Sequence, residues 1–559
     1  MWRRWRRRFL TVTAVALAIF LAMPVAPPWI ASRAGEIGEV RRSAADGWSA
    51  LGIHVAADVI SYGQATSNLY AAAPSLHAAY ALLTALTVVP LLSRPARLVM
   101  MTYPAALAFT LVATGEHYVV DVVAGALLVV GVELFWRRQE PPPVDVRTGS
   151  DRLARRWPWL GPVLVPMSLA AVIRVVRLDR PQVLVYDEVF YVNDALDLAL
   201  TGRQPAAFHP PFAKLVIAPF VGIGGFEPVM WRLPMLLCGV AVVGGVGVAT
   251  WLATADRRLT ALSGLLAAAD GLLVVTSRIV LLDGVAALCA TGTVVGLVGM
   301  LGPSGWTETG RRRWAPVLVL ATAAVGVATK WSLIPAAAVA VLVLTVAVHR
   351  RLGWGWPRAV ATMAGAFIIL TTAAWGPVVL RAADVPVAGA VARMVDDSLE
   401  MAEYHVDLER VGGGHASGLT WAVQNHSTVM YRRDCAGQLD LTDGVCRRGS
   451  VAPARIIAAG NPVLWIGGAA SLIALAITRR RDPMCRALVA LGGASWLPWT
   501  LPGADPYSYY GAAIAPVLAV VTAVALAGRR RQRVWASVAI GTLALAWLVW
   551  RYPELTAMT

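Results

Sequence analysis

The strongest constraint on the fold of this chain is a succession of long apolar runs separated by short polar, arginine-rich segments. A run of about 20 apolar residues crosses a bilayer as a helix, because lipid offers the backbone no hydrogen-bond partners. Hydrophobic residues make up 57% of the chain and charged residues only 15%, and a soluble protein of 559 residues could not keep that much apolar surface dry. The sequence therefore predicts an all-α polytopic membrane protein.

The apolar runs predict about 15 transmembrane helices, each near the length that a bilayer requires. They cover residues 9–29, 75–92, 98–114, 119–135, 158–176, 232–253, 259–275, 279–301, 315–330, 332–348, 359–380, 455–478, 487–502, 510–527 and 533–550. The first run follows a basic start and resembles a signal peptide, but Pro24, Pro27 and Pro28 end it without a clear small-residue cleavage site. We expect this run to be a retained first helix.

The net charge of +16 comes from arginines that cluster in the turns between apolar runs. Clusters such as Arg311–Arg313 and Arg479–Arg481 fall on one side of the membrane if the N-terminus is cytoplasmic. Nucleic-acid binding is disfavoured, because it needs a basic face on a soluble domain. We expect a multi-pass protein of the plasma membrane, with its N-terminus in the cytoplasm and the polar loops 30–74, 177–231 and 381–454 outside.

A polar, proline-rich stretch over residues 139–156 divides the chain, and this composition is typical of a stiff linker. We expect a membrane module at 1–138, a cytoplasmic linker at 139–156 and a larger membrane domain at 157–559. Three of the five cysteines lie in or beside apolar runs and are expected to be core thiols, namely Cys238, Cys289 and Cys485. Cys435 and Cys446 share one polar loop, and either a disulfide or two free thiols fits that position.

Two motifs in the N-terminal module each place a histidine at the outer end of an expected span. Ser75 and His77 open one span, where a helix N-terminus with free N–H groups attracts phosphate. His117 and Asp121 are four residues apart at the next outer end, so on a helix they share a face. A carboxylate beside an imidazole fixes the tautomer and raises the basicity, as a histidine that attacks phosphorus requires.

The two segments, Pro-Ser-Leu-His and Gly-Glu-His-Tyr-Val-Val-Asp, resemble the second and third motifs of the PAP2 phosphatase superfamily, in the variant of the inositol-phosphoryl transferases. The resemblance implies that His117 attacks phosphorus, that Asp121 orients it, that His77 protonates the leaving oxygen and that Ser75 helps to bind phosphate.

The N-terminal module also departs from the PAP2 pattern. No lysine followed by an Arg-Pro pair lies upstream, the third motif lacks its usual arginine, and about four spans are expected where the family typically has six. Arg33, Arg41 or Arg42 could supply the missing positive charge, but the sequence does not place them. An active phosphatase or phosphotransferase and a decayed module kept for packing or lipid binding both remain open.

In the larger domain, the first outer loop contains adjacent carboxylates at Asp187 and Glu188. Neighbouring carboxylates repel each other near a membrane surface, which tends to raise one pKa. A glycosyl acceptor needs such a base on its hydroxyl group, since a donor phosphate is already a good leaving group. The alternative is a pair of carboxylates in a solvated loop.

Several further polar segments interrupt the apolar runs in this domain. They are 208–214 with His209 and Lys214, 231–234 with Arg232, 277–284 with Arg278 and Asp283, Lys330 with Trp331, 460–462, and the tyrosine-rich 506–510. Ionisable residues at bilayer depth are costly and usually functional. Those near the ends of spans could instead reach the interface with their long side chains.

Over residues 155–550, these segments and their order resemble the protein O-mannosyltransferase family of GT-C glycosyltransferases. The resemblance implies about 11 spans here, and transfer of mannose from a polyprenyl-phosphate donor to Ser or Thr hydroxyls with inversion. It assigns Asp187 as the base and Glu188 as support for acceptor binding or for the position of the base. Arg232 becomes a candidate for the lipid phosphate or a structural anchor, with His209 and Lys214 lining the same site.

The outer loop 381–454 would cover this site, and Arg432 with Arg433 could grip a phosphate through bidentate hydrogen bonds. Three histidines of the loop lie about ten residues apart, which fits no compact metal motif. We therefore expect no metal site, and the need for a divalent ion is left open.

Taken together, the sequence predicts a polyprenyl-phosphate-sugar-dependent glycosyltransferase that acts on exported proteins, with Arg278 and Asp283 among its substrate-binding residues. A GT-C enzyme that glycosylates a lipid or cell-wall polymer would use the same donor chemistry. A lipid phosphatase with a lipid-binding C-terminal part, and a transporter or scaffold without chemistry, are the alternatives from other classes.

Overall fold

The computed structural model describes residues 2–40, 42–43, 45–46, 48, 57, 60–61, 71–89, 92, 94–139, 158–202, 208–302, 314–381, 387–407, 417–424, 427–433, 454–501, 506–527 and 530–557. The chain forms two compact units, Met1–Pro158 (unit 1) and Trp159–Thr559 (unit 2). Most of the expected linker, together with Cys435 and Cys446, lies outside the described residues.

Unit 1 is a small helical module. Its helices include α1 (Trp2–Ala22), α2 (Pro28–Arg33), α5 (Leu76–Val88), α6 (Arg94–Ala113) and α7 (Val119–Gln139). Helix α5 packs against α1, α6 and α7 around an apolar core that includes Leu83 and Val129. At Gly125 of α7, an added Cβ atom would lie 2.4 Å from the Ser75 carbonyl oxygen. Glycine therefore lets α7 approach the start of α5 closely.

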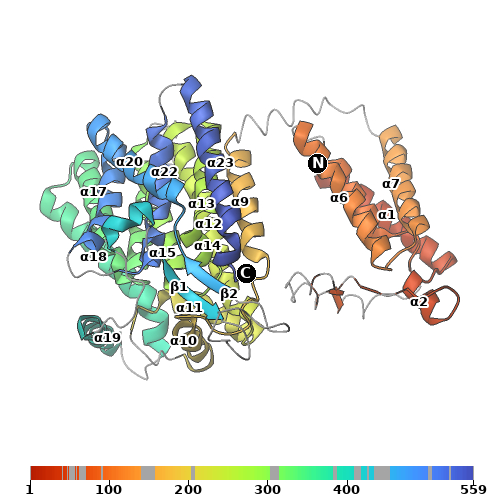
Figure 1. Ribbon diagram of the computed structural model, residues 1–559, viewed down its shortest axis with the longest axis horizontal. Coiled ribbons are helices and arrows are strands. Elements are labelled where there is room, and N and C mark those ends of the chain that lie inside the picture. Colours follow the sequence, from red (N-terminus) through yellow and green to blue (C-terminus); the bar gives the residue numbers. More distant parts are fainter. Residues whose placement is uncertain are drawn as a thin grey trace, which may run out of the picture. The chain divides into compact units, whose positions relative to one another are not determined.

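Unit 2 is a bundle of apolar helices with further elements gathered at one end (Figure 1). The helices of the bundle are α9 (Leu160–Val175), α12 (Pro228–Thr254), α13 (Arg257–Ala268), α15 (Leu282–Leu301), α16 (Trp314–Val327), α17 (Ile334–Leu352), α18 (Trp356–Arg381), α20 (Pro462–Thr478), α21 (Pro483–Trp496), α22 (Ala515–Ala525) and α23 (Arg530–Leu555). The others are α10 (Glu188–Thr201), α11 (Phe212–Gly224), α14 (Gly271–Val275), η3 (Trp331–Leu333), α19 (Val387–Asp407), η4 (Gly418–Val423), β1 (Thr428–Arg433), β2 (Ala454–Ala458), η5 (Leu497–Thr500) and η6 (Ser508–Ala513).

The helix starts in unit 2 follow local sequence signals. Asp256, Asp270, Asn461 and Asp482 each precede a helix, and their side chains accept hydrogen bonds from backbone N–H groups of the first turn. Such caps satisfy donors that otherwise have no partner inside the helix. Three of these capping residues, Asp256, Asn461 and Asp482, lie in arginine-rich or polar turns that adjoin apolar runs.

The protein is a polytopic membrane protein. Six helices of the described chain are long and apolar enough to cross a membrane, and seven further apolar helices of 10–17 residues accompany them. Among the six, α12 and α15 are the most enclosed, with 67% and 72% of their apolar windows buried, whereas α18 is only 11% buried. Helices α12 and α15 therefore form the centre of unit 2, and α18 presents apolar side chains outward.

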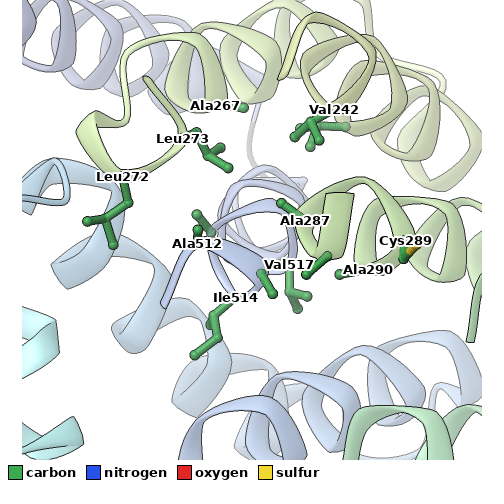
Figure 2. Close-up of a cluster of buried hydrophobic side chains, with 14 of the residues drawn as sticks. Val242, Ala267, Leu272, Leu273, Ala287, Cys289, Ala290, Ala512, Ile514 and Val517 are labelled. Carbon is green, nitrogen blue, oxygen red and sulfur yellow. The ribbon is translucent and has the colours of Figure 1, made fainter. Parts of the chain in front are cut away.

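The core of unit 2 joins segments that are far apart in the sequence. Figure 2 shows side chains of α12, α13, α14, α15, η6 and α22 converging, among them Val242, Ala267, Leu273, Ala287 and Val517. Many of these side chains are small, so the helices approach closely, as is typical of helix packing in membranes. Cys238, Cys289 and Cys485 are buried free thiols, which confirms their expected place in the core.

The loops of the sequence prediction contain more structure than expected. The segment 177–231 holds α10 and α11, and the segment 381–454 holds α19, η4 and β1. The expected span at 455–478 begins with strand β2, which pairs antiparallel with β1, and its helix starts only at Pro462. This small sheet is an addition to the predominantly helical fold. Hydropathy does not separate β2 from the helix that follows, because Ile456 and Ile457 of the strand lie at the start of the apolar run.

Candidate active sites

The loop that carries Asp187 has a strained entry. Tyr186 has φ 54°, in the left-handed region that bulky residues rarely adopt. Asp187 follows as the N-cap of α10, yet its side chain caps no backbone N–H group. The surroundings thus hold the Asp187 carboxylate away from the helix end that it would ordinarily cap.

Glu188, the neighbouring carboxylate, holds this loop in place through hydrogen bonds. It is fully buried and accepts two hydrogen bonds from Arg232, at 2.9 and 2.8 Å, as well as the N–H groups of Val185 and Val280. The same arginine donates to the carbonyl oxygens of Leu178, Pro181 and Val183. Every donor group of Arg232 is therefore engaged with the protein.

These contacts favour one of the two roles expected for Arg232, that of a structural anchor. A buried bidentate ion pair with its remaining groups hydrogen-bonded is a stable arrangement. Arg232 has the geometry of a structural anchor, and we do not assign it to the lipid phosphate. Glu188 fixes the position of Asp187 and offers no accessible oxygen atom to an acceptor.

Arg278 contacts the scaffold, and its expected role in substrate binding remains a prediction. Its guanidinium donates to the carbonyl oxygens of residues 173, 174, 176 and 177, at the C-terminal end of α9. A cation satisfies the carbonyl groups that a helix end leaves without partners. Nearby, Arg174 donates to Ser277 at 2.7 Å, so the ends of α9 and α14 are tied together.

Tyrosines surround the Asp187 carboxylate. The hydroxyl groups of Tyr191 and Tyr509 each lie 3.4 Å from Oδ2 of Asp187. The ring of Tyr186 meets Tyr507 and Tyr509 edge to face. Two donors on Oδ2 leave Oδ1 as the oxygen that can face a substrate.

A second ion pair lies beside these tyrosines. The Lys330 ammonium is 3.0 and 2.8 Å from the two oxygens of Asp283. It also lies 4.1 Å from the ring centroid of Tyr510 and 5.3 Å from that of Tyr509. Asp283 is thus committed to Lys330, and the pair contributes two opposite charges next to Asp187.

Burial raises the pKa of Asp187 to about 6. The positive charge of Lys330 opposes this rise, Asp283 adds to it, and the hydrogen bonds of Tyr509 and Tyr191 lower it. The expected direction of the shift is therefore found, but its main cause is desolvation and not repulsion by Glu188, whose charge Arg232 balances. A carboxylate with a pKa near 6 is ionised at neutral pH and can accept a proton.

His209 lies close to this cluster, on the segment that leads into α11, and Lys214 follows in the first turn of that helix. The ring of His209 is 6.0 Å from that of Tyr191 and 5.1 Å from that of His405 on α19. Burial keeps the pKa of His209 well below its usual value, so the ring is neutral. Lys214 forms a buried ion pair with Asp194 at 2.7 Å, which sequence reasoning missed.

Helix α19 covers the same end of unit 2. His405 lies 3.1 Å from the carbonyl oxygen of Phe208, and the ring of Tyr404 contacts that of Phe208 at 4.5 Å. Arg432 lies on strand β1 with an exposed side chain, paired in register with Arg455 of β2, and Arg433 pairs with Ala454. The strand places these arginines beside β2; a role in phosphate binding remains a prediction.

The histidine motifs of unit 1 meet in space. Ser75 caps α5 by accepting the Ala78 N–H group at 3.4 Å, and its own N–H group donates to the carbonyl oxygen of Asp121. The rings of His77 and His117 are 5.8 Å apart. Nδ1 of His117 lies 3.4 Å from Oδ2 of Asp121. The arrangement leaves Nε2 of His117 as the nitrogen that can attack.

One detail of unit 1 differs from the expectation. His117 precedes α7, which begins at Val119, so the contact with Asp121 comes from the turn and not from a shared helix face. The physical reason is that the turn itself is held, since the N–H groups of Glu116 and His117 both donate to the Leu111 carbonyl oxygen at the end of α6.

Within the described part of the chain, no group of three or more His, Cys, Asp or Glu side chains could hold a metal ion. Some contacts had a signal in the sequence that went unused. Tyr509 and Lys330 both lay in polar segments that interrupt apolar runs, but only the fold brings them to Asp187.

Comparison with known proteins supports a different family for each part. Residues 1–135 match the family model of the PAP2 superfamily. A polyprenol-phosphate-mannose–protein mannosyltransferase of Corynebacterium glutamicum is 29% identical over 111 residues, which are 18% of this chain and 21% of that relative. The chain thus matches about a fifth of the length of this curated relative.

Two solved structures resemble the fold. The protein O-mannosyltransferase complex Pmt1–Pmt2 of S. cerevisiae, bound to its sugar donor, superposes with a TM-score of 0.56 at 9% identity, over 72% of this chain and 90% of that chain. ArnT of Cupriavidus metallidurans gives a TM-score of 0.47 at 19% identity, over 69% of this chain and 63% of that chain. The superposition with Pmt1–Pmt2 shows that the chain has a GT-C-type glycosyltransferase fold, and both resemblances expected from the motifs are confirmed.

Proposed function

We propose that this protein is a polyprenyl-phosphate-sugar-dependent glycosyltransferase that transfers mannose to Ser and Thr hydroxyl groups of exported proteins. The observation that carries the proposal is the Asp187 carboxylate, which is half-buried, has its pKa raised to about 6 by desolvation and is held by two tyrosine hydroxyl groups on one oxygen. Such a group is matched to the removal of a proton from an alcohol at neutral pH.

The reaction is a single displacement with inversion. Asp187 accepts the proton of the acceptor hydroxyl group while the hydroxyl oxygen bonds to the anomeric carbon. The bond between that carbon and the phosphate oxygen breaks, and its electron pair leaves with the polyprenyl phosphate. Glu188 and Arg232 keep the base in position, since they fix the loop on both sides of it.

The donor and acceptor classes rest on the relatives. The Corynebacterium relative is named for polyprenol-phosphate-mannose and protein, and the yeast complex of similar fold holds a sugar donor. A lipid or cell-wall polymer as acceptor would use the same base and the same donor. The acceptor oxygen is an alcohol in each case.

In the proposed topology, the chain lies in the plasma membrane with its N-terminus in the cytoplasm and both sites outside. The basic clusters between apolar runs support this orientation. Elements α10, α11, α19, β1 and β2 gather at one end of unit 2, which is the end that carries Asp187 (Figure 1).

The test is transfer of radiolabelled mannose from polyprenyl-phosphate-mannose to exported membrane protein and to a Ser/Thr-rich peptide. We expect Asp187→Asn to reduce transfer by roughly a hundredfold or more, because a general base contributes about that much. His117→Ala, in unit 1, is the matched control and should transfer at the wild-type rate. Wild-type transfer that survives Asp187→Asn would overturn the assignment of the base, and label found only in lipid or polymer would change the acceptor.

A second activity is supported by the geometry of unit 1. With His117 next to Asp121 and 5.8 Å from His77, a lipid phosphate could contact both rings. Nε2 of His117 would bond to phosphorus, the bond to the lipid oxygen would break, and that oxygen would take a proton from His77. Water would then release phosphate from the histidine. Release of phosphate from a lipid phosphate, lost in His117→Ala and kept in Asp187→Asn, tests this phosphatase proposal.

A further inference from the structure

The sequence does not show which cation would balance the negative charge of a phosphate group at the unit 1 site. A phosphate group that approaches His117 needs a cation, because the two histidines and Ser75 supply no permanent positive charge. The upstream lysine with its Arg-Pro pair and the arginine of the third motif, expected from the PAP2 resemblance, have no counterpart in this sequence.

Arg42 pairs with the residue next to His117. Its Nε and Nη2 atoms donate to the two oxygens of Glu116 at 2.8 and 2.9 Å, across 74 positions of sequence. Glu116 immediately precedes His117. The Arg42 side chain is 19% exposed and that of Glu116 is 14% exposed, so the pair is sheltered but reachable.

Two further contacts hold Arg42 at this turn. The N–H group of Ser43 donates to the carbonyl oxygen of Thr114, which joins the segment of Arg42 to the end of α6. The Arg42 guanidinium also lies 4.4 Å from the ring centroid of Trp29, a buried residue of α2. Stacking on an aromatic ring favours arginine over lysine and leaves the edge of the guanidinium plane free for hydrogen bonds.

We propose that Arg42 is the residue that binds the phosphate group in unit 1, in place of the missing motif cations, and that Glu116 holds its guanidinium until a phosphate replaces the carboxylate. The ligand class is a phosphate monoester of a lipid, with inorganic phosphate as the smaller ligand of the same chemistry. This inference rests on the proposed phosphatase site.

In this exchange, a phosphate group takes the place of the Glu116 carboxylate on the Arg42 guanidinium. A carboxylate and a phosphate both match the two parallel N–H groups of a guanidinium, so one can replace the other without a change in the arginine's conformation. Glu116 therefore plays two opposite roles. It keeps Arg42 beside His117, and it competes with the incoming anion.

Substitutions of Arg42 and Glu116 distinguish phosphate binding from a purely structural ion pair, because the two roles predict different effects on binding. If the pair only ties the segment of Arg42 to the turn, loss of either partner damages the site in the same direction. If Arg42 binds phosphate, loss of the arginine weakens binding, whereas loss of the Glu116 charge removes a competitor and strengthens it.

The experiment uses the full-length protein in detergent and measures equilibrium binding of radiolabelled inorganic phosphate and of a short polyprenyl phosphate. Arg42→Gln should weaken both by about ten- to a hundredfold, the range of a charge-assisted hydrogen-bond pair. Arg42→Lys should weaken binding less than Arg42→Gln does, because lysine keeps the positive charge but lacks the two parallel N–H groups of the guanidinium. Glu116→Gln should strengthen binding several-fold. Arg33→Gln is the matched control, since Arg33 is exposed and lies over the same tryptophan at 4.9 Å; it should change binding little.

Shifts in the same direction for Arg42→Gln and Glu116→Gln, or no shift in either, would overturn the role of Arg42. A wild type that binds neither ligand would overturn it as well. A wild type that binds phosphate with the two opposite shifts but hydrolyses no lipid phosphate would remove the phosphatase activity and retain the binding site. Effects on the polyprenyl phosphate alone would identify a lipid contact that inorganic phosphate does not make, and would overturn the shared phosphate site.

Discussion

The Lys330–Asp283 pair should set the pH at which Asp187 loses activity as the base. In Lys330→Met, a positive charge that favours the ionised carboxylate is removed, so the pKa of Asp187 should rise. In Asp283→Asn, a negative charge that disfavours ionisation of Asp187 is removed, so the pKa of Asp187 should fall.

The size of the shift follows from the contacts. Lys330 lies 5.3 Å from the Tyr509 ring, whose hydroxyl group is 3.4 Å from Asp187. Two unit charges about 10 Å apart interact by roughly 1.7 kcal/mol at an effective dielectric constant of about 20, which corresponds to about one pKa unit. We therefore expect the pKa of Asp187 to move from about 6 to about 7 in Lys330→Met, and to move below 6 in Asp283→Asn.

The assay is kcat/KM for mannose transfer as a function of pH, because this ratio reports ionisations of the free enzyme. A base must be deprotonated, so activity falls as the pH drops through its pKa. The acidic limb should move to higher pH in Lys330→Met and to lower pH in Asp283→Asn. Lys214→Met breaks another buried lysine–aspartate pair and is the control for lost stability; its limb should stay near that of the wild type.

Either variant of this pair loses a buried ion-pair partner and should be less stable than the wild type. A loss of stability lowers activity at every pH. It cannot move the acidic limbs of the Lys330→Met and Asp283→Asn profiles in opposite directions. If both limbs move in the same direction, or neither moves, the electrostatic reasoning is refuted. A raised KM for the donor with an unmoved limb in Lys330→Met would instead place Lys330 in contact with the donor.

Three other predictions concern the scaffold and the tyrosines. Arg232→Met should destabilise the protein by about 3–5 kcal/mol, because Glu188 would be left buried without its partner; thermal unfolding in detergent measures this, and an unchanged midpoint would contradict the anchor role. Gly239→Ala should lower the yield of folded protein, since the new Cβ atom would lie 2.3 Å from the Ser277 Cβ atom, and size-exclusion chromatography would show it. Tyr509→Phe should move the acidic limb slightly upward, because its hydrogen bond lowers the pKa of Asp187; a downward shift would rule out that hydrogen bond.

Local sequence was sufficient to predict helices in the apolar runs of the membrane domain. Apolar runs predicted helices in every expected span, and capping residues such as Asp256 and Asp482 mark where helices begin. The short strands were missed because β2, at Ala454–Ala458, continues directly into an apolar run. Its pairing with β1 depends on a partner more than twenty positions away, which hydropathy does not report.

The candidate site shows the same division. Asp187 stood out because its chemistry is rare in an apolar chain, and the Asp-Glu pair suggested a raised pKa. The cause of the rise lies in burial, and Glu188 is neutralised by Arg232, which is 44 positions away. Ionisable residues at the ends of spans look alike in sequence, and only their partners separate an anchor such as Arg278 from a residue that faces the site.

The sequence by itself determined that the chain crosses a membrane, because this property depends on composition and on neighbouring positions. It also predicted a division near residues 139–156 and singled out the polar residues of the candidate sites. The tertiary structure alone decided which charges pair. It joined Glu188 to Arg232, Lys330 to Asp283 and Arg42 to Glu116. The physical reason is that the energy of a buried charge depends on the atoms within a few ångströms of it, and folding brings those atoms from distant parts of the chain.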